Sequence, residues 1–235
     1  SVQVAEQMAD YLLTGSVQNA INAPSVSAED APRLQPYMRL AEELGSFAGQ
    51  LTETGLTAVT IEFYGAVTQL NTKPLVSCAL HGLLKPLLEN VNMVSAPIIA
   101  KDRGIDVGVV SHENPGDYDN LVRVIVKTER RERTVSGTLF SGNRGRVVAI
   151  NQIPIEAELG EHMLYIANDD RPGVIGEIGG ALGKVGVNIA TFHLGRVDAG
   201  KEAIALIQVD DAVSFETLES IRKLTNITQV KPLRF

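Results

Sequence analysis

The pattern that most limits how this chain can fold lies in its last third, where short apolar runs and helical periods alternate. The first apolar run meets a polar turn, Asn168 to Asp170, and Pro172 and Gly173 then open a helical period. The expected order is strand, helix, strand, strand, helix, strand, over residues 163–168, 174–185, 188–197, 202–209, 214–223 and 227–234. This order predicts a βαββαβ unit with a four-stranded sheet.

The first two thirds of the chain carry a different mixture of patterns. An amphipathic helix is expected over residues 2–14, and a linker-like stretch rich in Pro, Ser and Asp runs from Asn22 to Pro36. Two more helices are expected over about 38–51 and over 74–91. Strands are expected over 57–64, 104–110, 121–128, 133–140 and 146–153. The chain is therefore predicted to be an α+β protein in which a mixed α/β middle domain precedes the βαββαβ unit.

Composition and charge exclude several classes of protein. The 235 residues suffice for two compact domains, and the 44% apolar fraction is that of an ordinary globular chain. A net charge of −7 argues against a nucleic-acid partner, which clustered Lys and Arg would bind. Charge or Gly interrupts every apolar stretch before the roughly 20 residues of a membrane span, so no bilayer insertion is expected. The single cysteine, Cys78, fits a reducing cytoplasm and is expected to be a buried filler.

Glycines recur at helical spacing in the helix expected over 174–185. They are Gly176, Gly179, Gly180 and Gly183. Each interior glycine costs roughly 0.5–1 kcal/mol relative to alanine, so a close-packed face against the helix's own sheet or another subunit is the expected compensation. A phosphate-binding loop is the alternative, but Ile178 stands where its motif needs Gly, and Val185 where it needs Ser or Thr. Nucleotide binding is therefore not expected at this turn.

The turn after the first strand of the βαββαβ pattern carries side chains suited to an amino acid ligand, which offers an ammonium, a carboxylate and, in serine, a hydroxyl group. Asp170 can accept the ammonium in a charge-assisted hydrogen bond. The amides of Asn168 and Asn188 can serve the carboxylate and hydroxyl, and N–H groups of the helix after Pro172 add affinity for an anion. Asn and Asp are also common turn formers and helix caps. The pairing with Asn188 and the βαββαβ order favour the effector site.

The other chemically active residues show no catalytic or metal-binding pattern. The four histidines share no metal-ligand spacing, and the sequence holds neither H-E-x-x-H nor a cysteine cluster. No nucleophile, base and orienting group stand at a recognisable spacing. Arg144 and Arg146, beside Gly142 and Gly145, are a candidate anion site because guanidinium groups and backbone donors can converge there, although an ordinary charged surface is the simpler interpretation.

Segments along the whole chain resemble one known family, in motif and in order. The opening VQVAEQMADYLLTG, followed by NAINAP, is similar to the last helix and exit segment of the nucleotide-binding domain of type 1 D-3-phosphoglycerate dehydrogenases. NMVSAPIIAKDRGI and GTLFSGNRGRVVAINQIPIEAEL resemble the intervening, allosteric substrate-binding domain of that family. MLYIANDDRPGVIGEIGGALGKVGVNIATFHLGRVDAG resembles its ACT domain, a ferredoxin-like βαββαβ regulatory module that holds an amino acid effector.

The resemblance implies three parts. Residues 1–24 would be the C-terminal helix and exit segment of a nucleotide-binding domain, 37–157 the intervening domain and 162–235 the ACT domain. The family's serine-site positions correspond to Asn168, Asp170 and Asn188. The resemblance therefore implies L-serine, or a similar small amino acid, as a feedback effector held between the ACT modules of a cytoplasmic homodimer or tetramer.

The resemblance also implies where catalysis would take place. The family oxidises 3-phosphoglycerate to 3-phosphohydroxypyruvate with NAD, on the route to L-serine. Its catalytic Arg, Glu and His and its Gly-rich NAD loop would lie upstream of Ser1. The chain itself is therefore expected to hold no cofactor and to serve regulation and oligomerisation. Basic residues of an anion site in some relatives correspond here to Arg146, but also to Ile153 and Glu158, so a complete anion pocket is not expected.

Two other functions compete with this one. The β-type chain of an iron-sulfur L-serine dehydratase also joins an intervening-type domain to an ACT domain, but it carries a G-P-S-S-S-H-T type motif that is missing here. A single Cys78 could not hold an iron-sulfur cluster either. A free-standing ACT sensor of amino acids is disfavoured by the similarity of residues 1–24 to a nucleotide-binding domain.

Overall fold

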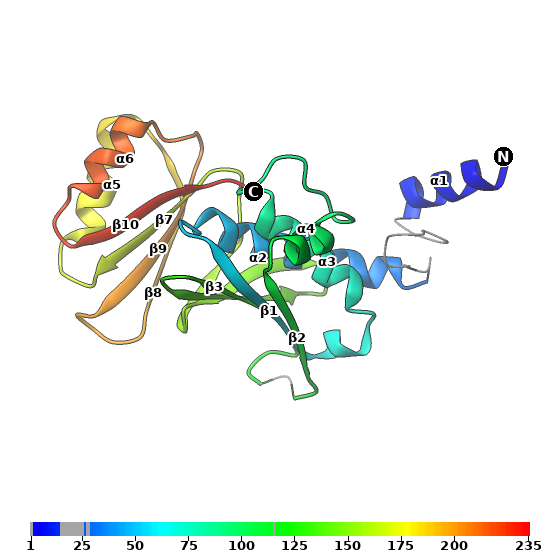
Figure 1. Ribbon diagram of the computed structural model, residues 1–235. Coiled ribbons are helices and arrows are strands. Elements are labelled where there is room, and N and C mark those ends of the chain that lie inside the picture. Colours follow the sequence, from blue (N-terminus) through cyan, green and yellow to red (C-terminus); the bar gives the residue numbers. More distant parts are fainter. Residues whose placement is uncertain (1, 15–25, 27–28, 115) are drawn as a thin grey trace. The chain divides into compact units, whose positions relative to one another are not determined.

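The computed structural model describes residues 2–14, 26, 29–114 and 116–235. The chain divides between Arg146 and Val147 into two compact units, and the expected α+β class is confirmed (Figure 1). Helix α1 (Val2–Thr14) forms where the amphipathic pattern predicted it. The exit segment after α1 and the first part of the predicted linker lie outside the described residues. Of the helices in these ranges, none is long and apolar enough to cross a membrane.

Helix α2 (Ala31–Gln50) begins earlier than the sequence indicated. Assigning the residues up to Pro36 to a linker was wrong for 31–36, which are helical. Pro32 lies in the first turn, where a backbone N–H has no helical partner, and Pro36 follows inside the helix. Prolines near a helix start are therefore a poor sign of a linker.

Helices α2 and α3 (Lys73–Leu84) pack closely because glycine lies at their contacts. A Cβ atom on Gly45 would lie 2.1 Å from the carbonyl oxygen of Ala79. On α3, a Cβ atom on Gly82 would lie 2.0 Å from the carbonyl oxygen of Glu42. The prediction that α3 extends to residue 91 was wrong, because Pro86 has no N–H to donate to the preceding turn.

The sheet of the first unit has strands in the order β2-β1-β3-β4, with β1 parallel to β2 and the other pairs antiparallel. Alternate residues of β1, namely Val59, Ile61 and Phe63, are buried, as a strand covered on one face requires. The short helices η1 and α4 were not predicted, because they offer too few residues for a periodic pattern. The bounds are β1 Leu56–Gly65, η1 Ala66–Gln69, α4 Ala96–Asp102, β2 Asp106–His112, β3 Asn120–Thr128 and β4 Glu132–Phe140.

A hairpin replaces the single strand predicted over 146–153. Strand β5 (Arg144–Ile150) pairs antiparallel with β6 (Ile153–Ala157). The two residues between them, Asn151 and Gln152, both have positive φ, 48° and 68°. Positive φ at both positions is the mark of a tight two-residue hairpin turn, which usually shows Gly at the second position. Gln at that position hid the turn from sequence analysis.

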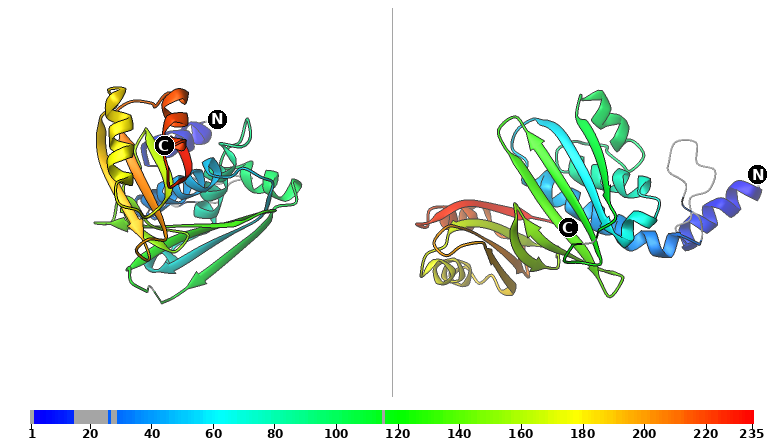
Figure 2. Two further views of the ribbon diagram at one scale, coloured as in Figure 1. Left: turned by 90° about the vertical axis from the view of Figure 1, so that its left-hand side faces the viewer. Right: turned by 90° about the horizontal axis from the view of Figure 1, so that it is seen from below.

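The second unit has the predicted βαββαβ order. Its sheet runs β10-β7-β9-β8, with β10 and β8 at the edges. Helices α5 and α6 lie together on one face of this sheet (Figure 2). The bounds are β7 Met163–Asp169, α5 Val174–Lys184, β8 Ile189–Arg196, β9 Glu202–Val209, α6 Phe215–Arg222 and β10 Ile227–Leu233. The expected ferredoxin-like fold is therefore present.

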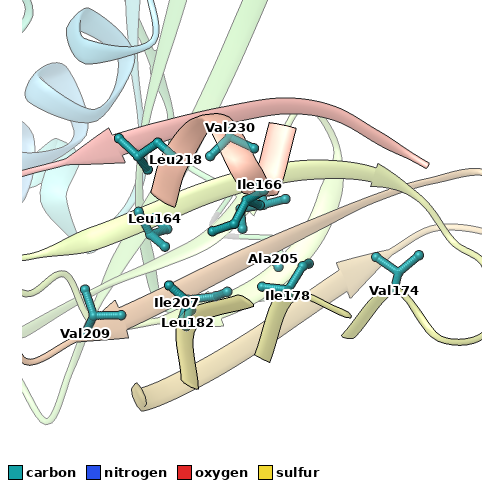
Figure 3. Close-up of a cluster of buried hydrophobic side chains, with 11 residues drawn as sticks. Leu164, Ile166, Val174, Ile178, Leu182, Ala205, Ile207, Val209, Leu218 and Val230 are labelled. Atoms are coloured by element: carbon teal, nitrogen blue, oxygen red, sulfur yellow. The ribbon is translucent and has the colours of Figure 1, made fainter. Parts of the chain in front are cut away.

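The core of the second unit lies between the two helices and the sheet (Figure 3). Helix α5 contributes Ile178 and Leu182, and the central strands β7 and β9 contribute Ile166 and Ile207. The opposite face of β8 lies against β6, where a Cβ atom on Gly195 would lie 2.5 Å from the carbonyl oxygen of Pro154. Strand β6 thus covers a face of β8 and leaves its edge free of any strand partner in the described ranges.

Candidate effector-binding site

Asn168 lies near the end of β7 with only 2% of its surface exposed. Side chains alternate along a strand, so it shares a face with Leu164 and Ile166, which pack under the helices. Its side-chain Nδ2 is buried and has no hydrogen-bond partner among the residues that the structure describes. An unsatisfied buried donor costs about 1–3 kcal/mol. The position therefore offers a donor that a ligand can satisfy.

Asp170 follows Asn168 in the turn and already has a cationic partner. Its Oδ2 accepts a hydrogen bond from the Arg196 guanidinium at 2.6 Å and another from the Gly200 N–H at 3.2 Å. Its own N–H donates to the carbonyl oxygen of Lys201 at 2.8 Å. The Arg196 hydrogen bond is the main reason why the pKa of the Asp170 carboxyl lies below its usual value, and the Gly200 N–H adds to the effect. The turn after β7 is thus tied to the β8–β9 hairpin.

Asn188 immediately precedes β8 and is exposed. Its Nδ2 donates to the Oδ2 of Asp210 at 2.7 Å, and the Asp210 N–H donates to its carbonyl oxygen at 3.3 Å. Asp210 follows β9, so this pair joins two loops at one end of the sheet. No Lys, Arg or His in the described ranges forms an ion pair with Asp210.

The three predicted site residues do not meet within one chain. The 168–170 turn lies where Asp169 pairs with Glu202 of β9, whereas Asn188 precedes Ile189, which pairs with Val209 at the other end of β9. These two ends are roughly 20 Å apart along the strand. Asn168 and Asp170 therefore lie near one end of β9, and Asn188 lies near the other.

The start of helix α5 adjoins the turn. Gly173 has φ 99° and no side chain of the described residues caps the helix, which leaves the backbone N–H groups of the first turn to other partners. The buried residues of α5 are Val174, Ile178 and Leu182. A Cβ atom on any of the four helix glycines would meet nothing within 4 Å. Within the described residues, the glycines of α5 therefore do not pack against the helix's own sheet, and their contact with another subunit stays a prediction.

The second candidate site, at Arg144 and Arg146, has a different environment. The guanidinium of Arg146 lies over the ring of Phe140, 4.7 Å from its centre, in a cation–π contact. Arg144 and Arg146 both have further interactions within the chain. An anion at this turn stays a prediction from the sequence. For metals, the described part of the chain contains no group of three or more His, Cys, Asp and Glu side chains that could hold an ion.

Arg196, Gly200 and Asp210, which contact the candidate site residues, were not predicted from the sequence. Arg196 ends a strand and Asp210 begins a loop, positions where charged residues are common and carry no motif. Only the strand register, which places Arg196 opposite Ala203, shows that Arg196 can reach Asp170. Glycine in the β8–β9 hairpin was the one signal that the sequence offered. It reflects the backbone conformation there, because Gly200 has a φ of 77°.

Comparison with known proteins identifies the family of both units. Residues 33–151 match the D-3-phosphoglycerate dehydrogenase intervening domain, and residues 162–226 match the ACT domain. The D-3-phosphoglycerate dehydrogenase of Synechocystis is 34% identical over 97% of this chain and 41% of its own length. The enzymes so named from Bacillus subtilis and Methanocaldococcus jannaschii are 31% and 32% identical over 98% and 97% of the chain, and 44% and 43% of their own lengths.

The chain thus spans about two fifths of the length of these relatives. The resemblance found in the sequence is confirmed: the chain belongs to the D-3-phosphoglycerate dehydrogenase family, with the intervening and ACT domains of that family.

Proposed function

We propose that this chain is the regulatory part of a D-3-phosphoglycerate dehydrogenase, which binds L-serine as a feedback effector and joins subunits. The observation that carries the proposal is the buried Nδ2 of Asn168 at the first turn of the ACT domain, which has no hydrogen-bond partner in the described part of the chain. Helix α5 begins after the same turn, and no side chain of the described residues caps it, so its first backbone N–H groups could join this donor in binding a ligand carboxylate.

A second copy of the chain would complete the site. Strand β8 is an edge strand, Asn188 precedes it, and Arg196 ends it. Two copies related by a twofold axis would pair their β8 edges antiparallel, so that the start of one strand faces the end of the other. Because Arg196 is bonded to Asp170, this pairing brings Asn188 of one copy towards the 168–170 turn of the other. The two half-sites then form one effector site.

The open face of α5 supports the same association. Its glycines leave the helix backbone bare, and Ile175 and Val185 beside them are about half exposed, at 50% and 55%. A bare helix face next to a free strand edge is a liability for an isolated domain, and a second copy would cover both. We therefore propose a homodimer, or a tetramer built from such dimers, joined through β8 and α5.

The parent enzyme would oxidise 3-phosphoglycerate with NAD in L-serine biosynthesis, in a cytoplasmic setting. We place the NAD site and the catalytic residues outside this chain. The purified chain should accordingly show neither NAD binding nor NADH production from 3-phosphoglycerate. Production of NADH would overturn the assignment of this chain to regulation alone.

Titration calorimetry tests the proposed function. The intact chain is titrated with L-serine, glycine, L-alanine and 3-phosphoglycerate. The proposal predicts saturable binding of L-serine, weaker binding of glycine and L-alanine, which lack its hydroxyl group, and no displacement of serine by 3-phosphoglycerate. Absence of L-serine binding, or equal affinity for all three amino acids, would contradict it.

A further inference from the structure

The two carboxylates of the proposed site differ in whether they are neutralised. Asp170 receives the Arg196 guanidinium at 2.6 Å and the Gly200 N–H at 3.2 Å. Asp210 receives the neutral amide of Asn188 at 2.7 Å and, within the described part of the chain, no cation. A ligand ammonium would have to displace Arg196 in order to pair with Asp170. At Asp210 it would meet a carboxylate without a charged partner.

The other end of the site is rich in donors. Among the residues that the structure describes, the buried amide nitrogen of Asn168 has no partner and no side chain caps the start of α5, which presents backbone N–H groups. The guanidinium of Arg196, whose side chain is 53% exposed, is held at the same turn by its ion pair with Asp170. Donors of this kind favour a carboxylate. In a β8-paired dimer, each effector would thus lie between a donor end from one copy and the Asn188–Asp210 pair of the other.

We infer that Asp210, held by Asn188, accepts the ammonium group of the amino acid effector, while the Asn168 turn of the second copy receives its carboxylate. This inference rests on the proposed function, because it assigns an orientation to the ligand of that same site. Asn188 then has two tasks, since it contacts the ligand and fixes the Asp210 carboxylate. Asp170 serves as a positioning residue that holds Arg196 at the turn.

The orientation has a consequence for specificity. A 2-hydroxy acid such as glycerate has the carboxylate and hydroxyl groups of serine but a neutral hydroxyl in place of the ammonium. It would leave Asp210 without a charged partner and would be rejected by this site. The structure thus assigns discrimination between amino acids and hydroxy acids to Asp210.

The test compares L-serine and glycerate by calorimetry in the wild-type chain and in Asp210→Asn, Asp211→Asn and Asp170→Asn. Asp211→Asn is the matched control, because Asp211 is the exposed neighbour of Asp210 and its substitution changes the net charge equally. Asp210→Asn is expected to weaken L-serine at least about ten-fold, as for loss of a charged hydrogen bond. Asp211→Asn is expected to stay within about two-fold, as for an ordinary surface change. Thermal unfolding of each variant confirms that it is folded.

The outcomes separate the inference from the function on which it rests. Loss of the preference for L-serine over glycerate in Asp210→Asn, with a smaller loss of serine affinity in Asp170→Asn, supports the assignment. Unchanged serine affinity in Asp210→Asn, or a larger loss in Asp170→Asn, overturns it and leaves serine binding intact. Failure of the wild-type chain to bind L-serine overturns the proposed function, and the inference with it.

Discussion

The guanidinium of Arg196 donates a hydrogen bond to Asp170 at 2.6 Å and thereby ties the end of an edge strand to the turn where an effector would bind. The two residues are far apart in sequence, and β9 lies between their strands in the sheet. This hydrogen bond places the Arg196 cation at the turn and neutralises the Asp170 carboxylate. The turn therefore presents hydrogen-bond donors, and not a free carboxylate, to a ligand.

The Arg196–Asp170 pair predicts a pH dependence. The pKa of the Asp170 carboxyl lies below its usual value chiefly because of Arg196, so the pair stabilises the fold above the usual Asp range and loses this effect as pH falls through the lowered pKa. In Arg196→Gln, the Asp170 pKa should rise towards its usual value. Carboxyl-detected NMR titration of both proteins measures this. An Asp170 pKa that stays equally low in the variant would show that other groups cause the shift.

Substitution of Asn168 by Leu separates a binding role from a structural one. Leu has a similar volume and removes a buried amide whose Nδ2 has no partner in the described chain, so the thermal unfolding midpoint should stay the same or rise. Affinity for L-serine should fall strongly, because the donor is lost. A lowered midpoint with unchanged affinity would assign Asn168 to the fold rather than to the ligand.

The sequence predicted the second unit better than the first, for a physical reason. Each element from β7 to β10 is long enough to show its period and is separated from the next by a polar or glycine turn. In the first unit, Pro36 suggested a break where α2 continues, and Gln152 concealed a hairpin turn. The candidate site residues Asn168, Asp170 and Asn188 could be proposed from the sequence because they stand in a recognisable pattern. Arg196 and Asp210 could not, because only strand register brings them to Asp170 and Asn188.

The contact between α2 and α3 predicts that Gly45 tolerates no side chain. A Cβ atom there would lie 2.1 Å from a backbone oxygen, so Gly45→Ala should force the helices apart and destabilise the first unit by about 1–3 kcal/mol, as overpacking does. Gly55→Ala is the control, because it makes the same change in the same unit where the nearest atom to the added Cβ would lie 3.6 Å away. Urea unfolding measures both. Equal unfolding midpoints in the two variants would contradict the close contact.

Glu43 predicts a second pH dependence, with the opposite sign. Burial raises the pKa of its carboxyl from 4.5 to about 7, partly offset by Arg39. Between these values the folded protein holds a proton that the unfolded chain has released, so this group makes the fold less stable as pH rises through the window. Glu43→Gln should remove that slope and raise stability at alkaline pH. The free energy of unfolding is measured for both proteins across this pH window. If it changes with pH in parallel for the variant and the wild type, Glu43 titrates normally and the prediction is contradicted.

Sedimentation equilibrium of residues 160–235, with and without L-serine, tests the central claim that the effector lies between two ACT domains. The account predicts a dimer at micromolar concentration and tighter association with L-serine, because a ligand that binds only the dimer stabilises it by mass action. Asn188→Ala should abolish the effect of serine. A species that stays monomeric at every concentration while it binds serine at full stoichiometry would contradict the shared site.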